Sequence, residues 1–439
     1  MFSAKTDVCP WYKRPIVWVV FLGLILRLGS VVLNHDEMRW QNDSRMSIPA
    51  ARILEGKGLT IEDGAGPTAY RPPLYILWLT AMYAVFGTFA LLGPSIIQAL
   101  VSTLNVWLAY RLGREIWKRE DAALAGALLL AIHPYTVWHD AALYHTFLST
   151  AFLFGGLILL FKARREGNMG LLLWSGICFG CCILITSVIL PFLLLLGIAA
   201  LFVNKMAVIT RVKTISVFAA GLMLIWTPWI MRNAYAFNAF VPLTTDSGIT
   251  AWQANNPRAP ELLPQRRQED APLPPGARLN IPDSYGWCYT HPGECKNGIS
   301  EADESALLVH AAREWIVSHP LDFASLTAWR MANIWSPLLT PAKSIFGHPV
   351  LDLLVAYGYP AWNIAIYTLI LIGSWNAWRE RLRSEVLILL TLAVTSTGVY
   401  ALFLFFTKYR IPFEAMLLPL AGGALAAITH KLGWFKRSV

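Results

Sequence analysis

The sequence places a carboxylate and an arginine in the polar stretch 42–75, which follows a long apolar run. Asp43 can take a proton from a hydroxyl or an amine as a general base. In the segment TAYRPPLY, two prolines hold the backbone extended and so present Tyr70 and Arg71 rigidly. A planar guanidinium group can pair with two oxygens of one phosphate. The alternatives are a capping or solvated carboxylate at Asp43 and an arginine that reaches lipid headgroups at Arg71.

Further cations lie beside other apolar runs. FFTKYRIPFE carries Lys408 and Arg410, and PWIMRN carries Arg232. If these loops converge with Tyr70 and Arg71, they form a cradle for an anion such as a lipid-linked phosphate. Anchoring to lipid headgroups is the alternative for each of them.

A third group of polar residues lies in HPYTVWHDAALYHT, residues 133–146. We expect His139, Asp140 and His145 to belong to an acceptor or sugar site. They could also bind a metal, but their spacing matches no metal-binding signature, so we predict no metal here.

The composition is that of a polytopic membrane protein. The chain is 56% hydrophobic and only 14% charged, with a mean hydropathy of +0.49. Its formal net charge is +9, but Lys and Arg cluster in short segments between apolar runs, which indicates topology rather than nucleic-acid binding. The absence of a phosphate-binding glycine loop argues against an ATP-driven pump, and the few acidic residues in mid-helix argue against an ion-coupled transporter.

Apolar stretches predict about ten membrane-spanning helices. The stretch 74–92 is long enough to span as well, but a crossing there would move the later basic loops to the outer face. The positive-inside rule therefore favours a re-entrant or interface-lying helix, and a full span is the main alternative. The predicted spans are residues 16–33, 94–112, 122–138, 142–161, 171–186, 188–203, 215–230, 350–375, 386–406 and 412–429.

This topology divides the chain into three parts. Residues 1–230 form an N-terminal transmembrane module with an outer loop at 35–73, residues 231–349 form a large outer loop, and residues 350–439 form the C-terminal helices. We predict a retained first span. In the first loop we expect a short helix from Ser47, as N-cap, to Gly56, and in the second an amphipathic helix over 301–318. Cys288 and Cys295 flank a turn-rich segment and are a candidate disulfide if that loop faces an oxidising compartment.

Four ordered blocks carry a resemblance to a known family. They are NDSRMSIPAARILEGKGL with GPTAYRPPLYILWLTAMYAVFG, then TPWIMRNAYAFNAFVPLTTDSGITAWQANNP, AAREWIVSHPLDFASLTAWRMANIW and TKYRIPFEAMLLPL. In this order the chain resembles the GT-C membrane glycosyltransferases of family 39, the protein mannosyltransferase-like group that includes bacterial transferases using polyprenyl-phosphate sugars.

The resemblance implies an all-α GT-C fold that transfers a hexose or pentose from a polyprenyl phosphate to an acceptor lipid, glycan or protein, with inversion. It implies a bacterial inner membrane protein whose site faces the periplasm, with the lipid donor as co-substrate and no cofactor. Asp43 matches the family's loop carboxylate, thought to be the general base, and Arg71 matches its phosphate-facing residue. The chain departs from the pattern at Arg45, Met46 and Pro49, and at Tyr144 and His145, where an acidic residue is common.

Two other functions fit parts of the sequence. An O-antigen ligase or polymerase shares the spans and the arginine-rich outer face, but does not usually need the acidic first loop. A lipid-linked sugar flippase or another transporter would place polar groups near mid-bilayer, whereas here they concentrate at one interface. The identities of the sugar and of the acceptor stay open.

Overall fold

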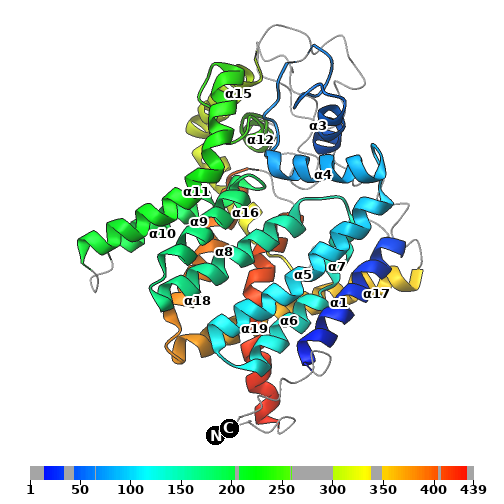
Figure 1. Cartoon of the computed structure of the whole chain (residues 1–439), viewed down its shortest axis with the longest axis vertical. Coiled ribbons are helices and arrows are strands. Elements are labelled where there is room, and N and C mark those ends of the chain that lie inside the picture. Colours follow the sequence, from blue (N-terminus) through cyan, green and yellow to red (C-terminus); the bar gives the residue numbers. More distant parts are fainter. Residues whose placement is uncertain are drawn as a thin grey trace, which may run out of the picture.

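The computed structural model describes residues 14–33, 44–64, 66–202, 207–257, 259, 300–337, 349–403 and 407–432. In these residues the elements are helices, apart from one isolated bridge between Thr60 and Pro67 (Figure 1). The helices are α1 (Pro15–Leu33), α3 (Ser44–Leu54), α4 (Pro73–Phe86), α5 (Leu92–Trp117), α6 (Glu120–Ala131), α7 (Pro134–Ala141), α8 (Thr146–Glu166), α9 (Met169–Ile183), η2 (Ser187–Ile189), α10 (Leu190–Leu201), α11 (Val208–Phe237), α12 (Asp246–Ala254), α15 (Glu301–Ser318), α16 (Pro320–Ile334), α17 (Pro349–Arg379), α18 (Arg383–Leu402), η5 (Thr407–Arg410) and α19 (Ile411–Lys431).

The predicted all-helical membrane architecture is confirmed. Among the described residues, 6 helices are long and apolar enough to cross a membrane, or up to 7 if the bent pair α6 and α7 forms one span. The apolar helices at Met169–Ile183 and Ser187–Leu201 are shorter. The larger number of about ten spans stays a prediction.

The stretch 74–92 is not one continuous helix. Helix α4 has 14 residues and ends before Gly87, whose φ of 95° suits glycine. At 1.5 Å per residue, α4 is about 21 Å long, which is shorter than the roughly 30 Å of hydrocarbon. In Figure 1 it lies beside α3 at one end of the molecule. These dimensions favour a helix that does not cross.

The predicted span 122–138 is wrong as a single helix. Its residues form α6 and α7, which bend by 53° at a short break. Pro134 cannot donate an amide hydrogen bond within a continuing helix, so it occupies the first turn of α7. The His133 side chain caps that turn by accepting a hydrogen bond from the Thr136 amide at 3.3 Å. Polar residues thus begin a new helix inside an apolar run.

The short helix in the first loop begins earlier than predicted. Helix α3 already starts at Ser44, so Ser47 lies within it rather than at the N-cap, and Pro49 lies inside it. The reason is packing, since Met46 and Ala50 join a buried cluster with Tyr75 of α4. Asp43 is outside the described residues, and in the sequence it directly precedes this helix.

The amphipathic helix predicted over 301–318 matches α15. Its first turn is capped by Ser300, whose hydroxyl accepts a hydrogen bond from the Asp303 amide at 3.1 Å. Leu308 and Ala312 of α15 pack against Trp252 of α12, which fixes the two helices together.

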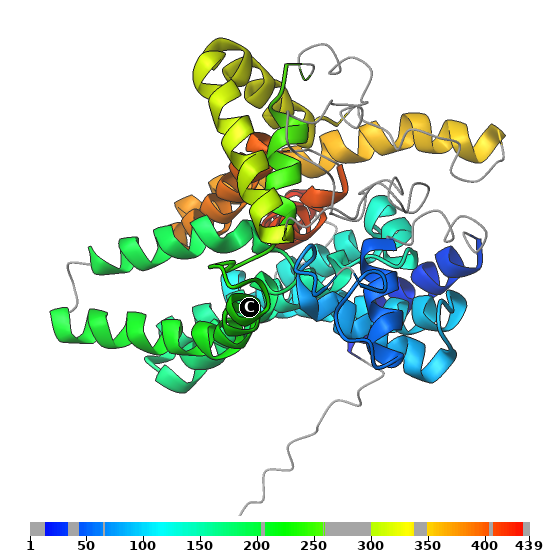
Figure 2. The ribbon, with the colours of Figure 1, turned by 90° about the horizontal axis from the view of Figure 1, so that it is seen from above.

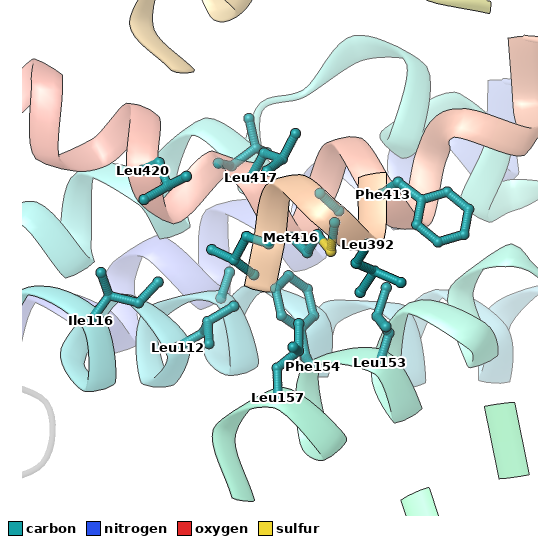
Figure 3. Close-up of a cluster of buried hydrophobic side chains, with 14 of the residues drawn as sticks. Leu112, Ile116, Leu153, Phe154, Leu157, Leu392, Phe413, Met416, Leu417 and Leu420 are labelled. Atoms are coloured by element: carbon teal, nitrogen blue, oxygen red, sulfur yellow. The ribbon is translucent and has the colours of Figure 1, made fainter. Parts of the chain in front are cut away.

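The centre of the bundle is formed around α19. Figure 3 shows Phe413, Met416 and Leu417 of this helix against Phe154 of α8 and Leu392 of α18. Helices α6 and α19 also approach closely. A Cβ atom on Gly422 would lie 2.3 Å from the Gly126 nitrogen, so only glycine allows this crossing. Figure 2 shows α19, in red, between the blue N-terminal helices and the orange C-terminal helices.

The helix ends with basic residues gather at one end of the bundle. Arg165 at the end of α8 pairs with Glu115 near the end of α5. The His430 ring lies 2.6 Å from the Asp121 carboxylate, which joins the end of α19 to the start of α6. In Figure 1 this end lies below, whereas α3, α4, α12 and α15 lie above.

Candidate active site

Tyr70 and Arg71 lie in a short loop that other elements hold from both sides. The Ala69 amide donates to Glu301 Oε1 of α15 at 3.0 Å, and the Thr245 amide donates to the Ala69 carbonyl at 3.1 Å. At the other end, Pro72 has φ −59° and ψ 142°, the extended conformation expected before Pro73. The loop therefore presents Tyr70 and Arg71 in a fixed position ahead of α4.

Glu301 is a partly buried carboxylate within this clamp. Burial raises its pKa above the usual value of 4.5, although hydrogen bonds from Thr245 and the Ala69 amide oppose the shift. Burial also raises the pKa of the Tyr70 hydroxyl, so this group stays protonated at neutral pH. Tyr70 thus acts as a neutral aromatic surface in the site.

Arg71 forms an ion pair with Asp246, the first residue of α12. Its Nη1 atom lies 2.6 Å from Asp246 Oδ2, and the two side chains are 14% and 15% exposed. The same guanidinium group lies 5.2 Å from the centre of the Tyr70 ring. Arg45 approaches that ring at 6.0 Å. Tyr70 thus lies between two cations.

Lys408 and Tyr409 of η5 join the same site. The Lys408 ammonium nitrogen lies 4.1 Å from the centre of the Tyr144 ring. Tyr409 stacks on Tyr400 with ring centres 4.6 Å apart. The Lys408 nitrogen also lies 5.9 Å from the centre of the Tyr409 ring. A shared phosphate site of Arg71 and Lys408 stays a prediction.

Arg232 reaches the loop but binds its backbone. Its Nη1 atom donates to the Thr68 carbonyl at 2.7 Å and to Asn233 Oδ1 at 3.0 Å. The guanidinium group also lies 5.2 Å from the Trp229 ring. Arg232 therefore holds the backbone of the Tyr70 loop from its position on α11.

Arg410 is fully buried and is occupied by protein partners. Its Nε atom donates to Glu414 Oε2 at 3.1 Å, its Nη2 atom donates to the Tyr359 hydroxyl at 2.6 Å, and its Nη1 atom donates to the Ile334 carbonyl at 3.1 Å. Glu414 Oε1 lies 3.3 Å from His133 Nε2. The sequence suggests that Arg410 lies at the outer interface and is available to a phosphate. In the structure it is buried and bound to other residues of the protein. It fixes the start of α19 and hence the position of η5.

Asp140 is likewise held inside the protein. Its Oδ2 atom accepts from Arg27 Nε at 3.0 Å and from the Ser102 hydroxyl. Gln98 donates to the Asp140 carbonyl at 3.0 Å. Asp140 therefore anchors the end of α7 to α1 and α5.

The two histidines lie beside Tyr144, whose ring Lys408 contacts. His139 Nδ1 lies 3.1 Å from the Thr146 hydroxyl oxygen, and the His139 ring lies 5.3 Å from the Tyr144 ring. The His145 ring lies 4.3 Å from the Tyr144 ring. Within the described ranges, no group of three or more His, Cys, Asp or Glu residues could hold a metal ion.

Sequence reasoning missed Asp246, Arg45 and Glu301. Asp246 and Glu301 each begin a helix, where an acidic residue is ordinary, so neither stands out. Their role comes from contacts with distant residues. Cys288 and Cys295 lie outside the described residues, so their pairing stays a prediction.

A family model of dolichyl-phosphate-mannose-protein mannosyltransferases matches residues 70–231. This stretch includes Tyr70, Arg71, both histidines and most of α11. The match confirms the resemblance to the protein mannosyltransferase-like glycosyltransferases that the sequence suggests. The fold and the match together describe a polytopic all-helical membrane protein that resembles this family over residues 70–231.

Solved structures extend the likeness over the chain. The oligosaccharyltransferase AglB from Archaeoglobus fulgidus, solved with an inhibitory peptide and a dolichol-phosphate, has 15% identity and a TM-score of 0.54, covering 97% of this chain and 52% of that one. ArnT from Cupriavidus metallidurans, bound to undecaprenyl phosphate, has 13% identity and a TM-score of 0.39, covering 95% and 79%. The chain thus spans about half the length of AglB. No curated protein matches it in sequence.

Proposed function

We propose that this protein is an integral membrane glycosyltransferase that moves a sugar from a polyprenyl-phosphate donor to an acceptor hydroxyl or amine, with inversion. The observation that carries the proposal is the gathering of Arg71 and Arg45 at the Tyr70 ring. Arg45 belongs to the helix that begins directly after Asp43. The family match over residues 70–231 supports the same reaction.

The residues fit this chemistry. The acceptor atom attacks the anomeric carbon, the bond from that carbon to the phosphate oxygen breaks, and Asp43 takes the acceptor's proton. Arg71 and Lys408 stabilise the negative charge on the departing polyprenyl phosphate. Tyr70 provides an apolar face beside the phosphate, and His139 and His145 line the acceptor or sugar side. Arg232, Arg410 and Asp140 position the loops that carry these groups.

We further propose that the site faces the periplasm of a bacterial inner membrane, in a topology with about ten spans. The pairs Arg165 with Glu115 and His430 with Asp121 gather basic helix ends at the end opposite α3 and α4. By the positive-inside rule the basic end is cytoplasmic, which places the site outside.

Transfer is tested with purified protein and a panel of synthetic polyprenyl-phosphate sugars. An extract of cell-envelope lipids, glycans and proteins serves as the acceptor source, and mass spectrometry measures released polyprenyl phosphate. We expect release that depends on the extract and is lost in Asp43→Asn. Movement of the intact lipid across liposomes without release would instead indicate a flippase and would contradict the proposal.

Orientation is tested separately by labelling intact spheroplasts with a membrane-impermeant thiol reagent. Asp63, whose side chain is 78% exposed, is replaced by cysteine in a background where the native cysteines do not react. We expect labelling of intact spheroplasts. Labelling only after the membrane is permeabilised would place the loop in the cytoplasm and exclude the proposed site.

A further inference from the structure

The ion pair between Arg71 and Asp246 joins the loop before α4 to the first residue of α12. The bond between Nη1 and Oδ2 is 2.6 Å long, and both side chains are largely buried. An ion pair that is withdrawn from water costs desolvation energy on both partners, so it is weak evidence for stability by itself. This ion pair involves Arg71, the cation that we propose binds the donor phosphate. Stability alone therefore does not explain why the pair is there.

The loop does not depend on this ion pair for its position. Glu301 accepts from the Ala69 amide at 3.0 Å, the Thr245 amide donates to the Ala69 carbonyl at 3.1 Å, and Arg232 donates to the Thr68 carbonyl at 2.7 Å. These bonds fix the backbone before Tyr70. Asp246 therefore acts mainly on the Arg71 side chain.

Asp246 is also only half satisfied. Its Oδ2 atom pairs with Arg71, but its Oδ1 atom is buried and accepts no hydrogen bond from any residue that the structure describes. A buried carboxylate oxygen without a donor costs free energy. A carboxylate with this geometry is a weaker partner for a guanidinium group than a phosphate that offers several oxygens.

We infer that Asp246 is a stand-in anion, a positioning residue that holds Arg71 over Tyr70 and is displaced when the phosphate of the donor lipid binds. This inference rests on the proposed function. Asp246 keeps the Arg71 charge compensated and its side chain ordered while the site lacks donor. Donor binding then exchanges one anion for another, so the measured affinity is lowered by the competition between them.

The test measures the binding of a polyprenyl phosphate, without a sugar, to the full chain in detergent by native mass spectrometry. Asp246→Asn removes the charge and keeps the shape. We expect the Kd of this variant to be about 5- to 30-fold lower than that of the wild type, a factor that corresponds to about 1–2 kcal/mol. A residue with a merely structural role would not tighten binding when it is replaced. Asp246→Ser is measured in parallel, so that the result does not depend on one substitution.

A matched control comes from Arg52 and Asp63, which form an ion pair with the same 2.6 Å distance but an exposed carboxylate. Asp63→Asn should leave the Kd unchanged. Combining Asp246→Asn with Arg71→Ala should abolish the gain, because the competition acts only through Arg71. Phosphatidylglycerol serves as a second ligand, and Asp246→Asn should not tighten its binding to the same extent.

The outcomes separate the two proposals. If Arg71→Ala weakens binding but Asp246→Asn and Asp246→Ser bind no better than the wild type, the stand-in role is overturned and the proposed function stands. If Arg71→Ala binds polyprenyl phosphate as the wild type does, the proposed phosphate site itself is overturned. An equal gain for phosphatidylglycerol would overturn the assignment of this site to the donor lipid.

Discussion

The Lys408 ammonium group lies 4.1 Å from the centre of the Tyr144 ring. The contact joins η5, just before α19, to the turn between α7 and α8. A cation over an aromatic face is attracted by the ring. The Tyr144 ring thus helps to fix the position of Lys408.

Replacing Lys408 tests this second cation. Lys408→Gln removes the positive charge that, in our proposal, stabilises the departing phosphate. We expect the rate of sugar transfer to fall about 100-fold to 1,000-fold. Lys57→Gln is the control, because Lys57 is exposed and pairs with Glu55. Initial rates at saturating donor compare the two variants, and equal rates would exclude Lys408 from the reaction.

Replacing Arg410 should affect stability more than chemistry. Arg410→Gln leaves the buried Glu414 carboxylate without its main partner, so we expect a loss of about 3–5 kcal/mol in the free energy of unfolding. Lys118→Gln, which removes an exposed partner of Glu115, should cost about 1 kcal/mol or less. Thermal unfolding in detergent measures both. A variant of Arg410 that is fully stable but inactive would instead favour direct phosphate contact.

The contrast between Lys408 and Arg410 shows how far sequence reasoning reaches. Both look like outer-interface cations in FFTKYRIPFE, yet Arg410 is buried and paired. A signal was present, because Glu414 follows at the i, i+4 spacing that favours an ion pair along a helix. The partners Tyr359 and Ile334 come from distant helices, and no local pattern predicts them.

The same limit applies to the site and to the helices. Arg71 and Asp246 are separated by 175 positions, so their pairing depends on tertiary packing alone. Apolar length correctly predicted the helical membrane fold, because burial in lipid requires it. Apolar length did not predict the break at Pro134, where the hydrophobic run continues but one helix ends and the next begins.

The partly buried Glu301 carboxylate predicts a pH dependence of stability. Burial raises its pKa in the folded state above the usual 4.5, so its contribution to stability is present at lower pH and is lost as the pH rises through the folded-state pKa. Glu301→Gln keeps an acceptor oxygen without the charge. We expect the variant to show a flatter dependence of the melting temperature as the pH rises above the usual carboxyl pKa of 4.5. A wild type that gains stability relative to the variant with rising pH would contradict this.

The crossing of α6 and α19 predicts a steric effect. A Cβ on Gly422 would lie 2.4 Å from the Ala122 carbonyl oxygen, so Gly422→Ala should destabilise the protein by about 1–3 kcal/mol. Gly197 in α10 has no such neighbour within 4 Å, and Gly197→Ala should be neutral or stabilising by about 0.5–1 kcal/mol. Thermal unfolding compares the two. Equal changes in the stability of the two variants would exclude the close contact between α6 and α19.

The most direct test of the account is the transfer rate of Arg71→Ala. Removing the guanidinium group should lower the rate about 100-fold to 1,000-fold. The protein should still fold, because Glu301 and Arg232 hold the loop, but it should lose some stability because Asp246 loses its partner. A well-folded Arg71→Ala protein that transfers sugar at the wild-type rate would contradict the proposed phosphate site.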